Sequence, residues 1–265
     1  PPGSTTTNWN NTVAPNVRYF TNGGFLSVHN EAHFGDDLPT PYLAFVNAGS
    51  IDAASLRVKS DYLQNNGALS SVDSMILQTF NGKLENGSSS SGGNTEFQAG
   101  TLKFNNYNLV ANGALNFDVT GALFDAGAGS ANVFTVDFGF NLLVKPPTGD
   151  MLGTTFQTRA PDWSYPEHIW AGQDRGATAM GYSNNVAMGQ LVLGPVGLGP
   201  FYTFSGTSTA NGLYADLLDL TSLGAGYTNA LQIDPNLTLY YAAAKLGVTP
   251  PASNGIPQLP EEYLN

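Results

Sequence analysis

One short motif recurs through the first half of the chain: a glycine placed two residues before Leu or Ile, usually behind Asn or Ala. Its copies are centred on Gly49, Gly67, Gly82, Gly100, Gly113 and Gly121. Alternate copies up to Gly113 repeat at about 32 residues, a period typical of stacked units. Asn and Gly tolerate the left-handed backbone of a tight corner, and the following aliphatic residue can point inward. The motif therefore predicts stacked units that each contain a turn and one or two short strands.

The composition is that of an ordered β protein with a neutral polar surface. Only 11% of the residues are charged, whereas aromatic residues make up another 11%, which a disordered chain of this polarity would lack. Twenty acidic residues against nine basic ones give a net charge of -11. This negative field repels phosphate backbones, and we expect no nucleic-acid partner.

The chain contains no cysteine, which excludes disulfides, thiolate metal sites and a cysteine nucleophile. It has no apolar stretch of membrane-spanning length. It begins with Pro1 rather than methionine, and we expect a processed or trimmed N-terminus. An acidic, cysteine-free chain rich in Asn, Gly and Thr is typical of secreted bacterial surface proteins, so we expect an extracellular or cell-surface location.

Alternating apolar and polar residues, as in 133–140, indicate half-buried strands along most of the chain. The pattern breaks at Lys145-Pro146-Pro147, where we place a domain boundary. The predicted organisation is an extended arm, a β-solenoid, a β-rich C-terminal region and a Pro/Asn/Gly-rich tail, over residues 1–16, 17–147, 148–246 and 247–265 respectively.

Together with the corner glycines, three later segments carry a resemblance to a known class of proteins. These segments are 149–155 (GDMLGTT), 206–216 (GTSTANGLYAD) and 229–241 (NALQIDPNLTLYY). The chain resembles, over most of residues 20 to 245, large secreted bacterial β-strand-repeat proteins of the autotransporter-passenger kind. The resemblance implies a parallel β-helix followed by a β-rich terminal region, and a surface-displayed structural protein with no catalytic residues to carry over.

We accordingly expect an all-β chain: a right-handed parallel β-solenoid followed by a C-terminal region with antiparallel pairing. The alternative is a single large jelly-roll sandwich. Closely spaced alternating strands do not by themselves distinguish parallel stacking from antiparallel pairing.

Three stretches are candidate metal sites. On a strand, the alternate residues His29, Glu31 and His33 would project to one face, and two imidazoles with a carboxylate could hold zinc or another divalent ion; the alternative is an ordinary polar stripe. Asp36-Asp37 and the segment 234–236 could offer oxygen ligands to calcium. Neither has the alternating acidic spacing of a calcium loop, and Asp-Pro-Asn is a common turn.

An aromatic-rich loop at 162–170 is a candidate glycan contact through Trp163, Tyr165 and Trp170. The alternative is that its tryptophans fill the end of a β core, because aromatic side chains bury large areas. Glu167-His168 and Asp174-Arg175 follow, but no serine elbow, triad spacing or paired-carboxylate motif accompanies them. The sequence therefore predicts no catalysis.

Two classes of function remain. The favoured one is a structural protein that associates with identical subunits into a filament, sheath or layer through residues 1–15 and 247–265, since the end rungs of a solenoid expose unpaired strand edges. The alternative is a glycan-binding adhesin or a β-helix polysaccharide-degrading enzyme. An enzyme of that kind needs clustered carboxylates on one face, whereas the acidic residues of the first half are scattered in the sequence, as at Asp61, Glu96 and Asp118.

Overall fold

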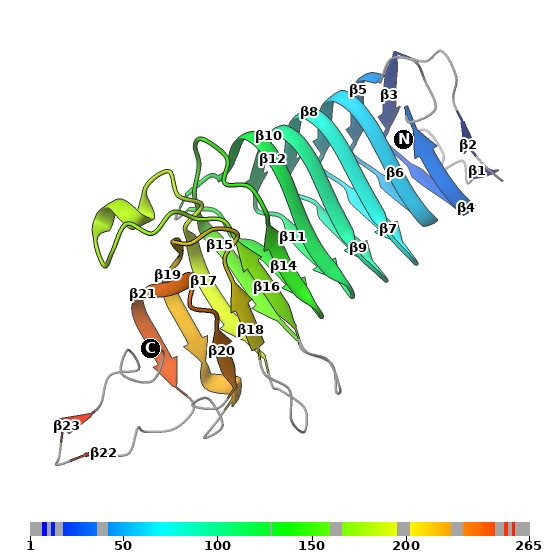
Figure 1. The fold of residues 1–265 in the computed structure, drawn as a ribbon. Helices are drawn as coiled ribbons and strands as arrows, with labels where there is room; N and C mark the ends of the chain where they lie inside the picture. Colours follow the sequence, from blue (N-terminus) through cyan, green and yellow to red (C-terminus); the bar gives the residue numbers. More distant parts are fainter. Residues whose placement is uncertain are drawn as a thin grey trace.

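The protein is a parallel β-solenoid of about nine turns, shown in Figure 1 as a stack of rungs that runs from the N-terminus to the C-terminus. The structure is a computed structural model, and it describes residues 7–9, 12–13, 18–35, 42–127, 129–159, 166–194, 202–223, 230–246, 252–253 and 256–257. The expected all-β solenoid is confirmed.

Strands account for nearly all the regular structure of the described residues. The first half of the chain contains β1 (Thr7–Trp9), β2 (Thr12–Val13), β3 (Tyr19–Asn22), β4 (Phe25–Phe34), β5 (Tyr42–Asn47), β6 (Ser50–Asn65), β7 (Ala68–Ser71), β8 (Met75–Glu85), β9 (Ser88–Ser91), β10 (Thr95–Asn105), β11 (Asn108–Ala111) and β12 (Ala114–Asp125). The second half contains β13 (Asn132–Val136), β14 (Gly139–Leu142), β15 (Met151–Thr158), β16 (Glu167–Trp170), the 3-10 helix η1 (Ala179–Tyr182), β17 (Met188–Leu193), β18 (Tyr202–Ser205), β19 (Asn211–Leu220), β20 (Leu231–Ile233), β21 (Leu237–Leu246), β22 (Ala252–Ser253) and β23 (Ile256–Pro257).

Each turn of the solenoid contributes one strand segment to each of three faces. Face 1 consists of segments 25–28, 50–53, 68–71, 88–91, 108–111, 132–136, 154–158, 190–193, 217–220 and 243–246. Face 2 consists of 31–34, 55–58, 75–79, 95–99, 115–119, 139–142, 167–170, 202–205 and 231–233. Face 3 consists of 19–22, 44–47, 62–65, 81–85, 101–105, 122–125, 148–151, 188, 211–215 and 237–241. The chain visits the faces in the order 1, 2, 3.

The period predicted from alternate glycines is wrong. Ser50, Ala68, Ser88 and Asn108 occupy the same place in successive turns. A complete turn in this part of the chain is therefore much shorter than predicted, about 20 residues, at the lower end of the range known for stacked repeats. The six glycines belong to different corners of the solenoid, and the spacing between different corners is not the length of a turn.

Glycines are required at the corner between faces 3 and 1. A Cβ on Gly49 would lie 2.0 Å from the carbonyl oxygen of Gly24, and one on Gly67 would lie 2.0 Å from that of Gly49. Gly87 continues the same column on Gly67. Successive turns therefore approach so closely here that no side chain fits. The other corners also carry glycines: Gly100 and Gly121 lie between faces 2 and 3, and Gly113 lies between faces 1 and 2.

The antiparallel pairing expected of residues 148–246 is not found between the described strands of that region. Strand β15 pairs in parallel with β17, β17 with β19, and β19 with β21. The chain therefore continues as one solenoid to Leu246, and the jelly-roll alternative is also wrong. The Pro-rich segment 145–147 lies after β14, between faces 2 and 3, so the break in the pattern marks a longer corner and not a new fold.

The predicted N-terminal arm is partly a rung of the solenoid. Strand β1 pairs in parallel with 26–28 of β4, and β2 pairs with Ala32 and His33 of the same strand. These two short strands therefore add a partial turn to the stack, next to β4 of the same chain. At the other end, β22 and β23 form a short antiparallel pair beyond the last rung.

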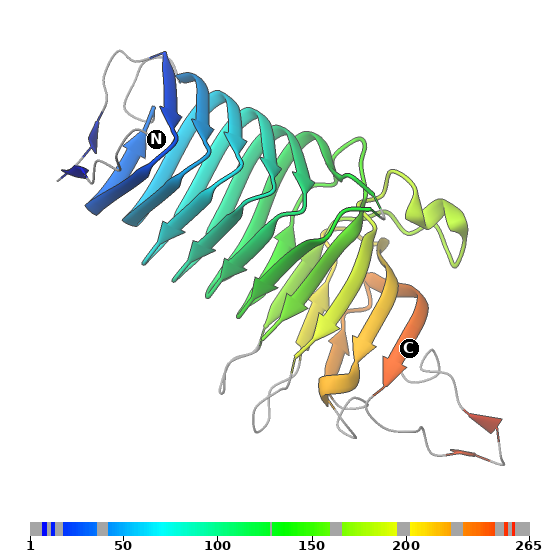
Figure 2. The same ribbon diagram turned by 180° about the vertical axis from the view of Figure 1, so that it is seen from behind.

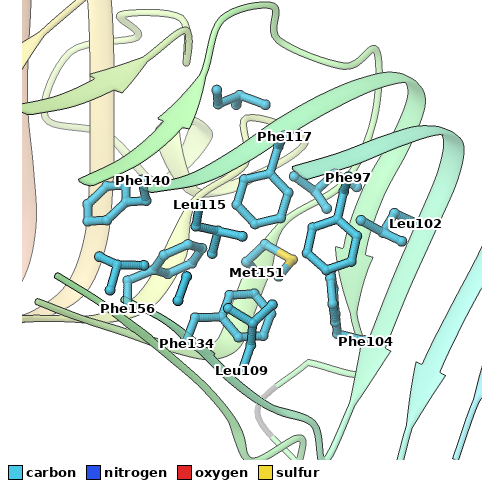
Figure 3. Packing of buried hydrophobic residues seen from close by; sticks show 14 of the residues in the cluster. Phe97, Leu102, Phe104, Leu109, Leu115, Phe117, Phe134, Phe140, Met151 and Phe156 are labelled. Atoms are coloured by element: carbon cyan, nitrogen blue, oxygen red, sulfur yellow. The ribbon is translucent and has the colours of Figure 1, made fainter. Parts of the chain in front are cut away.

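The interior contains aromatic rings in the first turns, where Phe20, Phe34 and Phe45 lie against one another, mainly aliphatic side chains from β6 to β8, and aromatic rings again from β10 onward. Figure 3 shows the aromatic region, where rings from successive turns lie against one another. The centroids of Phe104 and Phe134 are 4.7 Å apart, and those of Phe134 and Phe156 are 5.3 Å apart. These side chains are fully buried, so the core is continuous from one turn to the next.

A column of asparagines stabilises the corner between faces 3 and 1 in the early turns. The Asn22 amide donates to Asn47 Oδ1 at 2.8 Å, and the Asn47 amide donates to Asn65 Oδ1 at 2.7 Å. Asn65 in turn donates to the Tyr107 hydroxyl, which also contacts Ser89 Oγ. Because Asn47, Asn65 and Tyr107 are fully buried, these bonds satisfy polar groups that would otherwise be costly.

Candidate functional site

The proposed metal ligands His29, Glu31 and His33 are not brought together as a set. The register of β4 against β6 shifts between Val28 and Glu31, which places a corner where the prediction assumed a straight strand. His33 Nε2 lies 3.0 Å from Glu31 Oε2, but within the described ranges no group of three or more His, Cys, Asp or Glu side chains is placed to hold a metal ion. The alternation argument fails because it holds only along an unbroken strand.

The two calcium candidates have different outcomes. Asp36-Asp37 lies outside the described residues. In the segment 234–236, the Asn236 side chain accepts from the backbone N–H of Gly206 at 3.2 Å and donates to the Gly206 carbonyl at 2.9 Å. Asn236 therefore links the corners of two neighbouring turns. This is a structural role in a turn, the alternative to calcium binding that the sequence indicated.

Trp170 is a core residue and not an exposed glycan contact. Its side chain is fully buried, and its ring makes edge contacts with Phe140 and Phe156 at centroid distances of 5.7 and 5.8 Å. Trp163 and Tyr165 lie outside the described residues. For Trp170, the packing alternative is the correct one.

Glu167 and His168 point to opposite sides of face 2, because they are consecutive residues of β16. Glu167 is exposed, whereas His168 is fully buried and stacks between Phe140 and Phe204 at centroid distances of 4.1 and 4.7 Å. Its Nδ1 accepts the Phe140 N–H at 3.2 Å, and burial lowers the pKa of the imidazole to about 3. His168 is therefore a neutral member of the aromatic column and is separated from Glu167.

A long excursion between β16 and β17, residues 171–187, was not predicted from the sequence; its helix η1 projects from the stack in Figure 2. Asp150 closes its base by accepting the backbone N–H groups of Asn184, Asn185 and Ala187 at 2.6, 2.9 and 3.1 Å. Within it, the Arg175 guanidinium donates to the Ser183 carbonyl at 2.6 Å. Asp150 and Arg175 therefore hold a loop, and Asp174 likewise accepts the backbone N–H of Gly176 at 2.8 Å.

A trough runs along the edge of face 2, at the corner that leads to face 3. It consists of two adjoining hollows of about 330 and 490 Å³ that share Asp118. The first is lined by Lys59, Ser60, Asp61, Gln78, Thr79, Phe80, Gln98, Ala99, Gly100, Asp118 and Thr120. The second is lined by Glu96, Asn116, Phe117, Asp118, Asn141, Leu143 and Val144. We refer to these residues together as the face 2 trough.

Regular stacking arranges the polar groups of the trough in two rows. Gln78, Gln98 and Asp118 are register partners in successive turns, as are Glu96, Asn116 and Asn141. Neighbouring turns are about 4.8 Å apart, so each row presents a side-chain amide or carboxylate at that interval. Hydrogen bonds fix the orientation of these side chains: Gln98 of the first row donates to Glu96 of the second at 2.6 Å, and Asn141 donates to Asn116 within the second row at 2.8 Å.

The glycines of this corner create the hollow and support an aromatic ring. A Cβ on Gly100 would lie 3.1 Å from the Phe80 ring, so the ring lies directly against the Gly100 backbone. Gly121 lies on Gly100 in turn. Phe80 nevertheless remains 69% exposed, with its outer surface available at one end of the trough, while Leu143 and Val144 are exposed at the other end.

Sequence reasoning missed this site because it treated the acidic residues of the first half as scattered. Glu96 and Asp118 are well separated in the sequence, but adjacent turns place Glu96 beside Asn116 and Gln98 beside Asp118. The correct turn length was the missing signal. With it, the polar residues 78, 98 and 118 fall into one column.

Comparison of the chain with models of protein families, with curated proteins and with solved structures found no match. The solenoid is therefore assigned from its strand pairing. Across the ranges that the structure covers, no helix combines the length and the apolar character needed to span a membrane.

Proposed function

We propose that the protein is a structural element of an extracellular assembly, in which the solenoid acts as a rigid rod. The observation that supports this most strongly is the unbroken parallel pairing on face 1 from β4 to β21. Nine spacings of about 4.8 Å give a rod about 43 Å long. Since each turn packs only on its neighbours, such a stack transmits force along one axis and can be lengthened by adding turns.

The surface location rests on composition and on the sequence resemblance. The absence of cysteine, the small share of charged residues and the net charge of -11 favour a secreted protein. The resemblance to secreted β-strand-repeat proteins of the autotransporter-passenger kind points the same way.

The C-terminal end of the rod offers a surface for joining copies. Among the described residues, nothing pairs with the outer edges of β20 and β21, whose known partners are β18 and β19. An open strand edge pairs readily with another strand. Contact between opposite ends of identical chains is heterologous and propagates as a fibre. The N-terminal arm is a weaker candidate than its sequence indicated, because β1 and β2 already pair with β4 of the same chain.

Light scattering over a range of concentrations tests this assembly. We expect the mass of the wild-type particle to rise with concentration, and the double variant Ala242→Lys/Ala243→Lys, which places charges at exposed positions of the last strand, to remain a monomer because charged side chains block edge pairing. The matched control, Ser90→Lys/Asn108→Lys, adds the same charge at exposed positions in the middle of the stack and should assemble like the wild type. A wild-type protein that stays monomeric at every concentration would contradict end-to-end assembly.

The location is tested separately by labelling intact cells of the source with an antibody to the protein. Labelling of unbroken cells is the expected result. Labelling that requires permeabilised cells would contradict an extracellular role.

A further inference from the structure

We propose that the face 2 trough is a binding site for a neutral oligosaccharide, laid along the solenoid axis. The proposal is independent of end-to-end assembly, because the trough lies on the side of the stack and is complete within one chain. Three features of the trough lead to it: an exposed aromatic ring, two rows of oriented hydrogen-bonding groups, and the sign of the local charge.

Phe80 provides the apolar platform. A sugar ring presents C–H groups on its face and hydroxyls around its edge, so it stacks on a flat aromatic surface and leaves the hydroxyls free to bond elsewhere. The Phe80 ring has one side against Gly100 and is 69% exposed. Because one side of the ring already contacts Gly100, part of its side-chain freedom is lost before a ligand stacks on it.

The two polar rows match a chain of hydroxyl groups. The outward row of Gln78, Gln98 and Asp118 begins close to Phe80 and continues along the trough. Amide side chains both donate and accept hydrogen bonds, and carboxylates accept them through both oxygens. A hydroxyl group can donate and accept, so it can bond to either kind of side chain. The spacing of about 4.8 Å between turns repeats these contacts along the axis, so the trough suits an extended ligand more than a compact one.

The charge of the trough favours a neutral ligand over an anionic one. Its ionisable side chains are Asp61, Glu96 and Asp118 against Lys59, which leaves an excess of carboxylates within a protein of net charge -11. A uronate or sulfated sugar would be repelled. Carboxylates that accept from uncharged hydroxyls instead form charge-assisted hydrogen bonds.

The test is titration calorimetry of the wild-type chain with four neutral hexasaccharides, namely β-1,4-glucan, β-1,4-xylan, β-1,4-mannan and α-1,4-glucan, with oligogalacturonate as the anionic comparison. We expect at least one neutral probe to bind and oligogalacturonate not to bind. Phe80→Ala should weaken that binding about tenfold, since a stacking contact is worth up to about one order of magnitude. Asp118→Asn, which keeps the shape of the side chain and removes its charge, should weaken it about threefold or more.

The matched control is Phe138→Ala, which truncates an exposed phenylalanine that does not line the trough. It should bind the probe as the wild type does, and Phe80→Ala should melt at the wild-type temperature because its ring is exposed. The proposal is overturned if no neutral probe binds at millimolar concentration, if oligogalacturonate binds as well as the neutral probes, or if Phe138→Ala and Phe80→Ala weaken binding equally. All these binding measurements use dilute protein, so their outcome does not depend on whether the chains assemble end to end.

Discussion

The turns between residues 50 and 125 and the turns between 132 and 246 share one architecture but are stabilised in different ways. In the first group the turn length is nearly constant, the corners between faces 3 and 1 are columns of glycine, and Asn47 and Asn65 bond from one turn to the next. In the second group the turns are longer and unequal, and the longest joins the register partners Thr155 and Gln190. Their extra length is placed in corner excursions such as 171–187, whose base Asp150 closes. Buried aromatic rings occur in both groups, among them Phe97, Phe104 and Phe117 in the first and Phe134, Phe140 and Phe156 in the second. Regular repetition therefore supports the first group, and individually closed loops support the second.

The largest effect that tests this comparison is expected from Trp170→Ala. Removing a fully buried indole that contacts Phe140 and Phe156 should lower the free energy of unfolding by about 3–5 kcal/mol. Because turns interact chiefly with their neighbours, hydrogen exchange should show protection lost in 132–246 before 50–125. Phe138→Ala, at a 48% exposed position, should change stability by less than about 0.5 kcal/mol. Uniform loss of protection along the chain would show that the two groups are not separable.

The second effect concerns acid stability and His168. Its folded-state pKa is about 3, against about 6.5 in an unfolded chain, so between these values only the unfolded state takes up the proton. Stability is then fully present above pH 6.5 and falls as the pH is lowered toward 3, by about 2 kcal/mol between pH 6 and pH 4.5.

In His168→Phe this contribution to the pH dependence should disappear, while the aromatic column is retained. The measurement is urea unfolding of both proteins at a series of pH values. Phe138→Ala, which removes no titratable group, should keep the wild-type slope. Equal slopes in wild type and His168→Phe would mean that the imidazole is not buried in the neutral form.

A smaller effect is expected from Asn47→Ala in the regular turns. The substitution removes the donor to Asn65 and the acceptor of Asn22, and should cost about 1–3 kcal/mol because buried partners lose their bonds. Asn66→Ala, next to the same corner but exposed, should cost less than about 0.5 kcal/mol. The measurement is thermal unfolding of the two variants. Equal stability of Asn47→Ala and Asn66→Ala would show that the asparagine column does not stabilise the fold.

The sequence predicted the class of the fold better than its dimensions. Glycine corners and alternating strands led correctly to a parallel solenoid, because both are local features. The turn length was wrong since Gly49, Gly100 and Gly113 mark three different corners, and nothing local distinguishes one corner from another. The antiparallel region was predicted from close strand spacing after Pro147, which also arises when corners become longer and pairing stays parallel.

The same reasoning explains the outcome at the predicted sites. The set His29, Glu31 and His33 was inferred from alternation along one strand, and a shift in register within β4 removes that condition. Trp170 was a candidate glycan contact because it belongs to an aromatic-rich segment, with core packing as the alternative. Its position on face 2 points inward, so the packing alternative is correct. The face 2 trough depends on residues from several turns, so it could be recognised only after the register of the turns was known.

The glycine column between faces 3 and 1 also determines where this chain can accept new sequence. That corner is short in the regular turns, whereas the corner between faces 2 and 3 has grown into segments such as 143–147 and 171–187. A graft placed at 48–49 or 66–67 would separate backbones that touch directly and would break the stack. The same holds at 72–73, because a Cβ on Gly92 would lie 1.8 Å from the carbonyl oxygen of Val72. A peptide or whole domain inserted at 177–178, between faces 2 and 3, would instead extend from an excursion at residues that are already exposed. The rod is thus a display scaffold whose permissive position is the long excursion and not the tight glycine corners.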